Sequence, residues 1–166
     1  MAKILLVSDT HGINDRLIEV IKKEKPFDLL VHCGDLGMTE RELMTLADVP
    51  VHSVQGNCDY FYDLPPVSVF TFQGHKFFVT HGHNYHVDYG YESLYYRALE
   101  LEAEYVFFGH THVPVLKDMD GITIANPGSL SRPRQAGGEP TYMVMDVFEE
   151  KKGNIKLKSI QYNPNV

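Results

Sequence analysis

The stretch KILLVSDTHG, residues 3–12, decides how this chain is organised. Its apolar core at residues 4–7 is short enough to be a buried strand. A carboxylate and an imidazole, those of Asp9 and His11, follow where this strand ends. Burying an unpaired charge is costly, so these side chains need a compensating ion or partner. Their oxygen and nitrogen atoms suit a divalent transition metal, whereas a helix N-cap at Asp9 and a loop position for His11 is the alternative interpretation.

Strands and helices alternate through the first third of the chain. Apolar residues recur at helical spacing after Asn14 and Asp15, and Thr39 with Glu42 forms a capping-box pattern before a second helix. The expected helices are residues 14–25 and 39–47, and the expected strands are residues 3–7, 28–33 and 50–54. The connections are long enough for parallel pairing, so this part of the sequence predicts an α/β unit with polar residues at each strand exit.

After Pro65 and Pro66 the pattern changes to paired strands. Asp120-Gly121 stands between two strand-like runs and indicates a two-residue hairpin turn. A further helix is expected near residues 93–102. The expected strands are residues 67–72, 76–80, 105–108, 115–119, 122–125, 141–148 and 155–160. The second half of the chain therefore adds hairpins and one more helix to the α/β unit.

Length and composition are those of one globular domain over residues 1–166. Hydrophobic residues make up 43% and charged residues 22%, which is ordinary for a water-soluble protein, and no apolar run could cross a bilayer. The first strand begins almost at Met1, so no signal peptide is expected. Two cysteines are too few for a disulfide framework, which favours a reducing cytoplasm. The net charge of −7 argues against an extended nucleic-acid surface.

Polar clusters of one kind recur at the predicted strand ends. They are Asp9-x-His11, Gly34-Asp35, Gly56-Asn57, His81-Gly82-His83 and Gly109-His110-x-His112. In an open α/β sheet the carboxyl ends of the strands converge on one crevice, where ligands bind, and a glycine beside a ligand permits close approach. The set holds two aspartates, one asparagine and up to five histidines. These are too many ligands for one ion, but they suit two ions that share a bridging carboxylate.

Two metal ions at such a site would support hydrolysis of a phosphate ester. A metal pair can clamp the attacking and leaving oxygens of an in-line phosphoryl displacement, and it lowers the pKa of a bridging water towards neutrality. Mixed oxygen and nitrogen ligation fits manganese, iron, nickel or zinc better than magnesium or calcium. Capping or turn formation could explain each residue by itself, but it does not explain why all of them fall at strand ends.

These blocks, in this order, resemble the calcineurin-like metallophosphoesterase family over nearly the whole chain. The GNCD block at residues 56–59 and the NPGS block at residues 126–129 are similar to its small bacterial and archaeal phosphodiesterase branch. The resemblance implies an α/β metallophosphoesterase fold, a four-layer αββα sandwich of two mixed β-sheets flanked by helices. It also implies two divalent metal ions, with manganese expected and iron, nickel or zinc as alternatives. The implied ligands are Asp9, His11 and His112 for one ion, Asn57, His81 and His110 for the other, and Asp35 as the bridge.

The resemblance implies a phosphodiesterase, a metal-dependent hydrolase in which a metal-bridging hydroxide attacks a small phosphodiester in line. The expected catalytic residues are Asp35, Asn57, His83 and Cys58. His83 would either face the phosphate or brace His81. Many relatives carry at the Cys58 position a histidine that helps to protonate the leaving oxygen. A thiol with a reference pKa near 8.5 is a poor substitute, and nearby cations would draw it towards thiolate, so slow turnover or a preference for activated esters is expected.

Other functions fit the same resemblance. One is a phosphomonoesterase of the same fold, and another is a non-catalytic protein-binding scaffold like the retromer subunit of this fold, whose metal site is degraded. A metal sensor without turnover is a third. The complete set of ligand residues favours an enzyme. A homo-oligomer, either a dimer or a tetramer, is compatible with the tyrosines at residues 85–96, which suit a subunit interface, core packing or an aromatic substrate rim.

A few further polar residues have less specific patterns. His32 lies within a buried strand and is expected to be a core residue, whereas His52 and His75 are expected at the surface. Arg132 and Arg134 follow the NPGS block. They would either steer an anionic substrate or belong to a solvated loop.

Overall fold

The computed structural model describes residues 1–160, which form two five-stranded sheets and three α-helices. In chain order the elements are β1 (Ala2–Val7), α1 (Asp15–Glu24), β2 (Leu29–His32), α2 (Glu40–Ala47), β3 (Val51–Ser53), β4 (Val67–Phe72), β5 (His75–Thr80), a 3-10 turn (His83–Tyr85), α3 (Glu92–Leu101), β6 (Tyr105–Phe107), β7 (Val115–Met119), β8 (Ile122–Asn126), β9 (Thr141–Val147) and β10 (Asn154–Ser159). Every helix and strand expected from the sequence is therefore present, with ends shifted by a few residues at most.

Both sheets are mixed. The first sheet has the order β10-β9-β1-β2-β3, in which β1, β2 and β3 pair in parallel and β9 is antiparallel to both β1 and β10. The second sheet has the order β4-β5-β6-β8-β7, in which β5, β6 and β8 pair in parallel and the two edge strands are antiparallel. The parallel strands are the three central strands of the second sheet, whereas in the first sheet they are β1, β2 and the edge strand β3. The polar clusters follow the carboxyl ends of these parallel strands.

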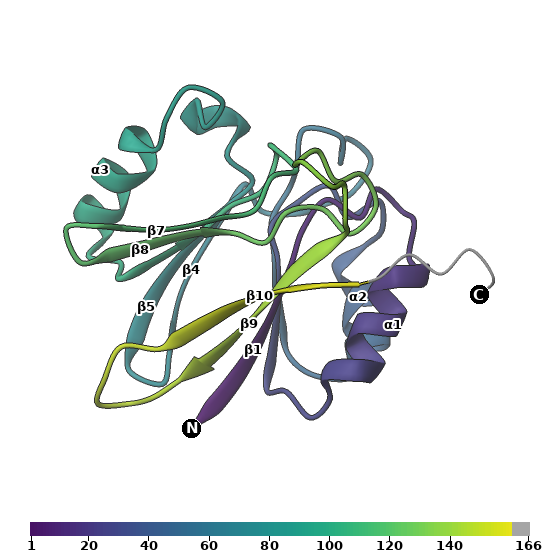
Figure 1. Cartoon of the computed structure of the whole chain (residues 1–166), viewed down its shortest axis with the longest axis horizontal. Helices are drawn as coiled ribbons and strands as arrows, with labels where there is room; N and C mark the ends of the chain where they lie inside the picture. Colours follow the sequence, from purple (N-terminus) through teal and green to yellow (C-terminus); the bar gives the residue numbers. More distant parts are fainter. Residues whose placement is uncertain (161–166) are drawn as a thin grey trace.

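The sheets pack face to face, with helices on both outer faces. Figure 1 shows α1 and α2 outside the first sheet and α3 outside the second. Side chains of β1 alternate between two buried clusters: Leu5 and Val7 face the helices, whereas Ile4 and Leu6 face the second sheet. A strand covered on both faces requires a continuous apolar run, which is what residues 4–7 provide. The expected four-layer αββα sandwich is confirmed.

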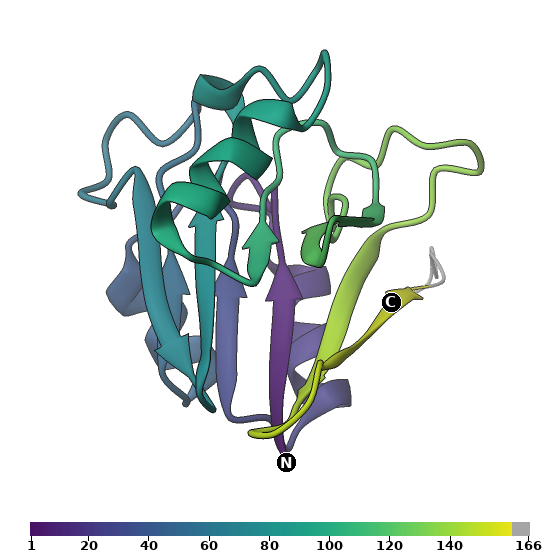
Figure 2. The ribbon, with the colours of Figure 1, turned by 90° about the vertical axis from the view of Figure 1, so that its left-hand side faces the viewer.

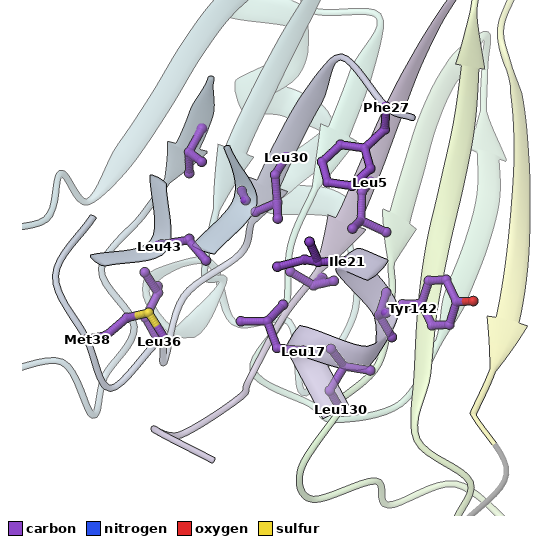
Figure 3. Close-up of a cluster of buried hydrophobic side chains, with 14 of the residues drawn as sticks. Leu5, Leu17, Ile21, Phe27, Leu30, Leu36, Met38, Leu43, Leu130 and Tyr142 are labelled. Carbon is purple, nitrogen blue, oxygen red and sulfur yellow. The ribbon is translucent and has the colours of Figure 1, made fainter. Parts of the chain in front are cut away.

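The outer cluster of the first sheet anchors its two helices. Figure 3 shows Leu17 and Ile21 of α1 meeting Leu5 and Leu30 of the sheet, and all four side chains are buried. Helix α2 begins at the expected capping box, in which the Thr39 hydroxyl accepts from the backbone N–H of Glu42. Within residues 1–160 no helix combines the length and the apolar character that a membrane crossing requires.

A buried carboxylate ties the end of α1 to the far edge of the first sheet. Glu24 is 4% exposed, and its carboxylate contacts Lys3 Nζ at 3.2 Å, Lys158 Nζ at 2.9 Å and the Tyr142 hydroxyl at 2.6 Å. Burial raises the pKa of Glu24, but the hydrogen bonds from these three partners outweigh burial and lower the pKa to about 2. The network joins α1, β1, β9 and β10 through one charge.

The sequence analysis placed three histidines outside the polar clusters, and the structure corrects one of these placements. His32 is buried as expected and its ring contacts the Thr10 hydroxyl at 2.9 Å, while His52 is half-buried and stacks on Phe70. His75 is buried, although it was expected at the surface. Its ring nitrogens lie 2.7 Å from a Glu104 carboxylate oxygen and 2.6 Å from the Phe148 carbonyl oxygen. The local sequence does not show these partners, because they are distant in the chain.

Candidate metal centre

The carboxyl ends of the parallel strands of both sheets meet at one rim. Figure 2 shows β1 running from the N-terminus up to this rim, where the connecting loops gather. Contacts across the two sheets fix the meeting point: the His110 backbone N–H donates to Asp9 Oδ2 at 3.1 Å, and His81 Nδ1 lies 2.7 Å from the Cys33 carbonyl oxygen. The structure brings together all the expected metal-binding residues, which are Asp9, His11, Asp35, Asn57, His81, His110 and His112.

Four of these residues form a tight group. Each of Asp9, His11, Asp35 and His112 offers one ligand atom, and the four atoms lie within 4.8 Å of one another. His112 Nε2 is 3.1 Å from Asp9 Oδ1 and 3.3 Å from His11 Nε2. Three of the four side chains are buried, and that of His11 is 9% exposed. Such a group of oxygen and nitrogen donors is a candidate site for a divalent metal ion.

A second group faces the first across Asp35. Asn57 Oδ1 is 3.0 Å from His81 Nε2 and 3.1 Å from His110 Nδ1. Asp35 Oδ2 is 3.2 Å from His81 Nε2 and 3.7 Å from His11 Nε2, so one carboxylate oxygen reaches both groups. This placement is the one that a bridging carboxylate requires, and the individual ligand roles stay predictions.

Hydrogen bonds at the back of two rings show that a cation fits this site. The Nδ1 atoms of His81 and His112 each face a backbone carbonyl oxygen at 2.7 Å, those of Cys33 and Arg132. A carbonyl only accepts, so Nδ1 carries the proton and a neutral ring turns the Nε2 lone pair inward. Those inward atoms face oxygens that also only accept. Asp9 Oδ1 is itself buried and has no hydrogen-bond donor in the described part of the chain. A cation between them would satisfy all these lone pairs at once.

Without such a cation, protonated histidine rings would pair with the carboxylates that face them. Burial lowers the pKa of His81, but the hydrogen bond with Asp35 and the charges of Asp9 and Asp35 outweigh burial and raise it. Burial raises the pKa of Asp9, but contact with His112 and the charge of His81 outweigh burial and lower it. Both shifts favour an imidazolium beside a carboxylate. Because a metal ligand must be the neutral ring, metal binding at this site should release protons.

The backbone at the rim is folded into conformations that are rare for side-chain-bearing residues. Positive φ angles between 50° and 71° occur at Asp9, His11, Asp35, His110 and His112. The left-handed region costs energy for any residue other than glycine, and residues held there cluster at functional sites. These five residues belong to the expected ligand set, and five other residues of residues 1–160 that are not glycine, such as Asp48 and Glu102 at helix ends, also have positive φ angles.

Glycines let the ligand residues approach one another. A Cβ atom added at Gly56 would lie 2.0 Å from Asp35 Oδ1, and one added at Gly34 would lie 2.5 Å from His81 Nδ1. A side chain at either position would displace the carboxylate or the ring. The glycines beside the expected ligands therefore make room for the ligands themselves.

The sequence analysis gave Asp59 no role, yet its carboxylate connects two of the loops. Asp59 is 0% exposed and accepts backbone N–H groups from Gly56 at 2.9 Å, Gly37 at 3.1 Å and Leu36 at 3.3 Å. In return, the Cys58 N–H donates to Asp35 Oδ1 at 2.8 Å. The two loops that carry Asp35 and Asn57 are thus joined in both directions. The sequence around Asp59 does not show this role, because the bonds to Leu36 and Gly37 end on a different loop.

His83 and Cys58 lie at the rim beside the two groups. The His83 ring centroid is 5.4 Å from that of His81 and 6.1 Å from that of His110, and its Nδ1 atom is buried with no hydrogen-bond partner among residues 1–160. Burial and then the charges of His81 and His110 lower the pKa of His83. Cys58 is exposed, and partial burial together with the charge of Asp35 raises the pKa of its thiol. The shift towards thiolate that the sequence analysis expected depends on nearby cations, so it stays a prediction.

The tyrosine-rich segment contributes a contact that the sequence analysis missed. Asp88 Oδ2 lies 3.3 Å from His110 Nε2, on the side of the ring away from Asn57. The tyrosines of this segment differ in burial. Tyr91 packs against the buried cluster between α3 and the second sheet, which includes Leu94 and Val106, whereas Tyr89 is 92% exposed. Core packing thus explains part of this segment, and the acid in it reaches the candidate metal centre.

Sequence comparison relates the chain to phosphoesterases. A family model described as the calcineurin-like phosphoesterase superfamily domain matches residues 2–150. The probable metallophosphoesterase YsnB of Bacillus subtilis is 37% identical over 132 residues, which cover 79% of this chain and 76% of that protein. The phosphodiesterase YfcE of Escherichia coli is 28% identical over 171 residues, with 88% of each chain covered.

Solved structures share the same fold. A predicted phosphoesterase from Streptococcus pneumoniae aligns with a TM-score of 0.78 at 29% identity, covering 96% of this chain and 98% of that one. Vacuolar Protein Sorting 29 from Cryptosporidium parvum aligns with a TM-score of 0.76 at 18% identity, covering 97% and 98%. At that identity the second likeness concerns the fold alone.

Proposed function

The chain belongs to the calcineurin-like phosphoesterase superfamily, and from this premise we propose that it is a phosphodiesterase that works with two divalent metal ions. In this proposal Asp9, His11 and His112 hold one ion, Asn57, His81 and His110 hold the other, and Asp35 bridges them. Manganese is the proposed metal, with iron, nickel and zinc as alternatives that the same donors would accept.

The observation that carries the proposal is the inward-facing set of lone pairs. The Nδ1 atoms of His81 and His112 each donate to a backbone carbonyl oxygen. Their Nε2 atoms face carboxylate oxygens, which cannot donate. Two bound cations would supply Lewis acidity for the phosphoryl oxygens and lower the pKa of water towards neutrality. The chain itself fixes two of the donor rings, because the carbonyl oxygens of Cys33 and Arg132 hold His81 and His112.

The residues around the groups favour a phosphodiester with a good leaving group. His83 presents a buried, unpartnered Nδ1 beside the rings of His81 and His110, where it can contact a phosphoryl oxygen. Cys58 occupies the position at which many relatives have a histidine that protonates the leaving oxygen. The raised pKa of its thiol makes it a poorer proton donor than an imidazolium. A small, activated diester needs that proton least, which is why we place it ahead of a phosphomonoester.

The scaffold alternative does not require that the metal-binding residues converge. A protein-binding relative needs the fold but has no use for converging donors, and here all seven expected ligands converge. The geometry therefore favours a working hydrolase over a scaffold.

Metal analysis together with a substrate panel tests the proposal. Purified protein loaded with manganese should bind about two equivalents and hydrolyse an activated aryl phosphodiester faster than the matching monoester. Asp35→Asn should lose most of the metal and the hydrolysis. Asp63→Asn is the matched control, because Asp63 is an exposed acid in the loop after β3. A wild-type protein that binds no metal, or an Asp35→Asn variant with full activity, would contradict the proposal.

A further inference from the structure

We propose that His32 is a positioning residue that aligns two loops of the candidate metal centre. Asp9 and His11 lie on the loop after β1, and Asp35 lies on the loop after β2. His32 is the last residue of β2, and its side chain is fully buried. The inference rests on the proposed function, in which those three loop residues bind metal, and it adds a side chain to which that proposal gives no role.

The direction of each hydrogen bond of His32 follows from groups that can only donate or only accept. The Gly34 backbone N–H donates to His32 Nδ1 at 3.2 Å, so this nitrogen carries the lone pair. The ring proton is therefore assigned to Nε2, which lies 2.9 Å from the Thr10 hydroxyl oxygen and donates to it. The Thr10 hydroxyl in turn donates to the Leu36 carbonyl oxygen at 3.2 Å. The hydrogen bonds thus run in one direction, from Gly34 to Leu36.

The burial of the ring agrees with this tautomer. Burial is the main cause that lowers the pKa of His32 to about 3, so the ring is neutral. A neutral ring that accepts at Nδ1 and donates from Nε2 has no lone pair left for a metal ion. His32 therefore acts on the candidate metal centre through its hydrogen-bond partners.

These partners are the direct neighbours of proposed metal ligands. Gly34 and Leu36 lie on either side of Asp35, and Thr10 lies between the two ligand residues of the loop after β1. The hydrogen bonds of His32 therefore start just before Asp35, reach the other loop at Thr10 and return just after Asp35. This path fixes the position of Asp35 relative to the ligands beside Thr10.

Backbone hydrogen bonds join the same two loops, and the His32 side chain supplements them. The His11 N–H, for example, donates to the Asp35 carbonyl oxygen at 2.8 Å. Without the imidazole, the Gly34 N–H and the Thr10 hydroxyl would each lose a partner in a buried place, where water cannot readily replace it. A shift of either loop that restored a partner would also change the distances between ligand atoms, so metal binding should weaken.

Manganese titration of folded His32 variants tests the inference. His32→Leu removes both hydrogen bonds of the ring and should raise the dissociation constant of manganese by about 10-fold. His32→Gln can still donate to Thr10 from its amide, so its dissociation constant should lie between those of wild type and His32→Leu. His32→Asn can accept from Gly34 but is too short to reach Thr10, so it should bind manganese as weakly as His32→Leu.

His75→Gln is the matched control, and nitrogen NMR checks the tautomer directly. His75 is also a buried histidine with a partner at each ring nitrogen, but it lies at the other end of β5 from His81. His75→Gln should lower the free energy of unfolding, measured in urea, and change the manganese dissociation constant by less than about twofold. In the NMR spectrum of zinc-loaded wild-type protein, Nε2 of His32 should carry the proton and Nδ1 should not.

Manganese binding separates this inference from the proposed function, because it does not require turnover. If wild-type protein hydrolyses no phosphodiester but His32→Leu weakens manganese binding as expected, the positioning role stands and the proposed activity fails. If wild-type protein hydrolyses diesters and His32→Leu keeps its manganese affinity, the inference is overturned. It is also overturned if Nδ1 of His32 carries a proton, if His32→Gln binds manganese no better than His32→Asn, if His75→Gln weakens binding as much as His32→Leu, or if wild-type protein binds no manganese.

Discussion

Replacing Asp59 by alanine should destabilise both the fold and the candidate metal centre. The substitution removes a carboxylate that accepts backbone N–H groups from Leu36, Gly37 and Gly56. Leu36 and Gly56 are buried and Gly37 is half-buried, so water cannot fully replace the lost acceptor. Each buried donor left without a partner costs about 1–3 kcal/mol. We expect a loss of about 3–5 kcal/mol, which is a large part of the typical stability of a domain of this size.

The same hydrogen bonds fix the loop that carries Asp35 relative to the loop that carries Asn57, so metal binding should weaken as well. Urea unfolding measures the first effect, and manganese titration of the folded protein measures the second. Asp59→Asn keeps one acceptor oxygen and should lie between wild type and Asp59→Ala, which keeps the test usable if the alanine variant does not fold. Asp63→Ala is the control, because Asp63 is exposed in the same loop. A loss below about 1 kcal/mol for Asp59→Ala would refute the reasoning.

Two further predictions concern Glu24, at the end of α1, and Cys58, in the loop after β3. The pKa of Glu24 is lowered to about 2 from 4.5, so its stabilising contribution is complete above pH 4.5 and disappears as the pH falls towards 2. The difference in unfolding free energy between wild type and Glu24→Gln, at most roughly 3 kcal/mol, should therefore shrink over that range, and a constant difference would argue against the buried ion pairs. Cys58→His should leave metal content unchanged and increase hydrolysis of less activated esters relative to activated ones; loss of metal would show that Cys58 has another role.

The elements of this fold could be predicted because their patterns are local. The apolar run at residues 4–7 is buried on both faces, and Thr39 with Glu42 caps a helix through contacts within one turn. The polar residues at strand ends could be grouped because the carboxyl ends of parallel strands must lie at one edge of a sheet. That reasoning treated the strands as one sheet, however, and only the resemblance to a known family implied that they belong to two.

The residues that the sequence analysis missed or misplaced all act through partners far along the chain. His75 is buried because Glu104, just before β6, and Phe148, just after β9, come to its ring. Asp88 is relevant only because His110 lies beside it. The hydrogen bonds that give Asp59 its role also end on a different loop. No periodicity or spacing contains that information.

The sequence by itself determined the strands, the helices and the set of candidate metal-binding side chains, because these patterns depend on neighbours a few residues apart. The tertiary structure decided which atoms of those side chains face inward. Carbonyl oxygens behind His81 and His112 fix which ring nitrogen has a free lone pair, and these come from Cys33 and Arg132, far away in the chain. Orientation depends on hydrogen bonds between distant segments, and such bonds exist only once the two sheets have packed together.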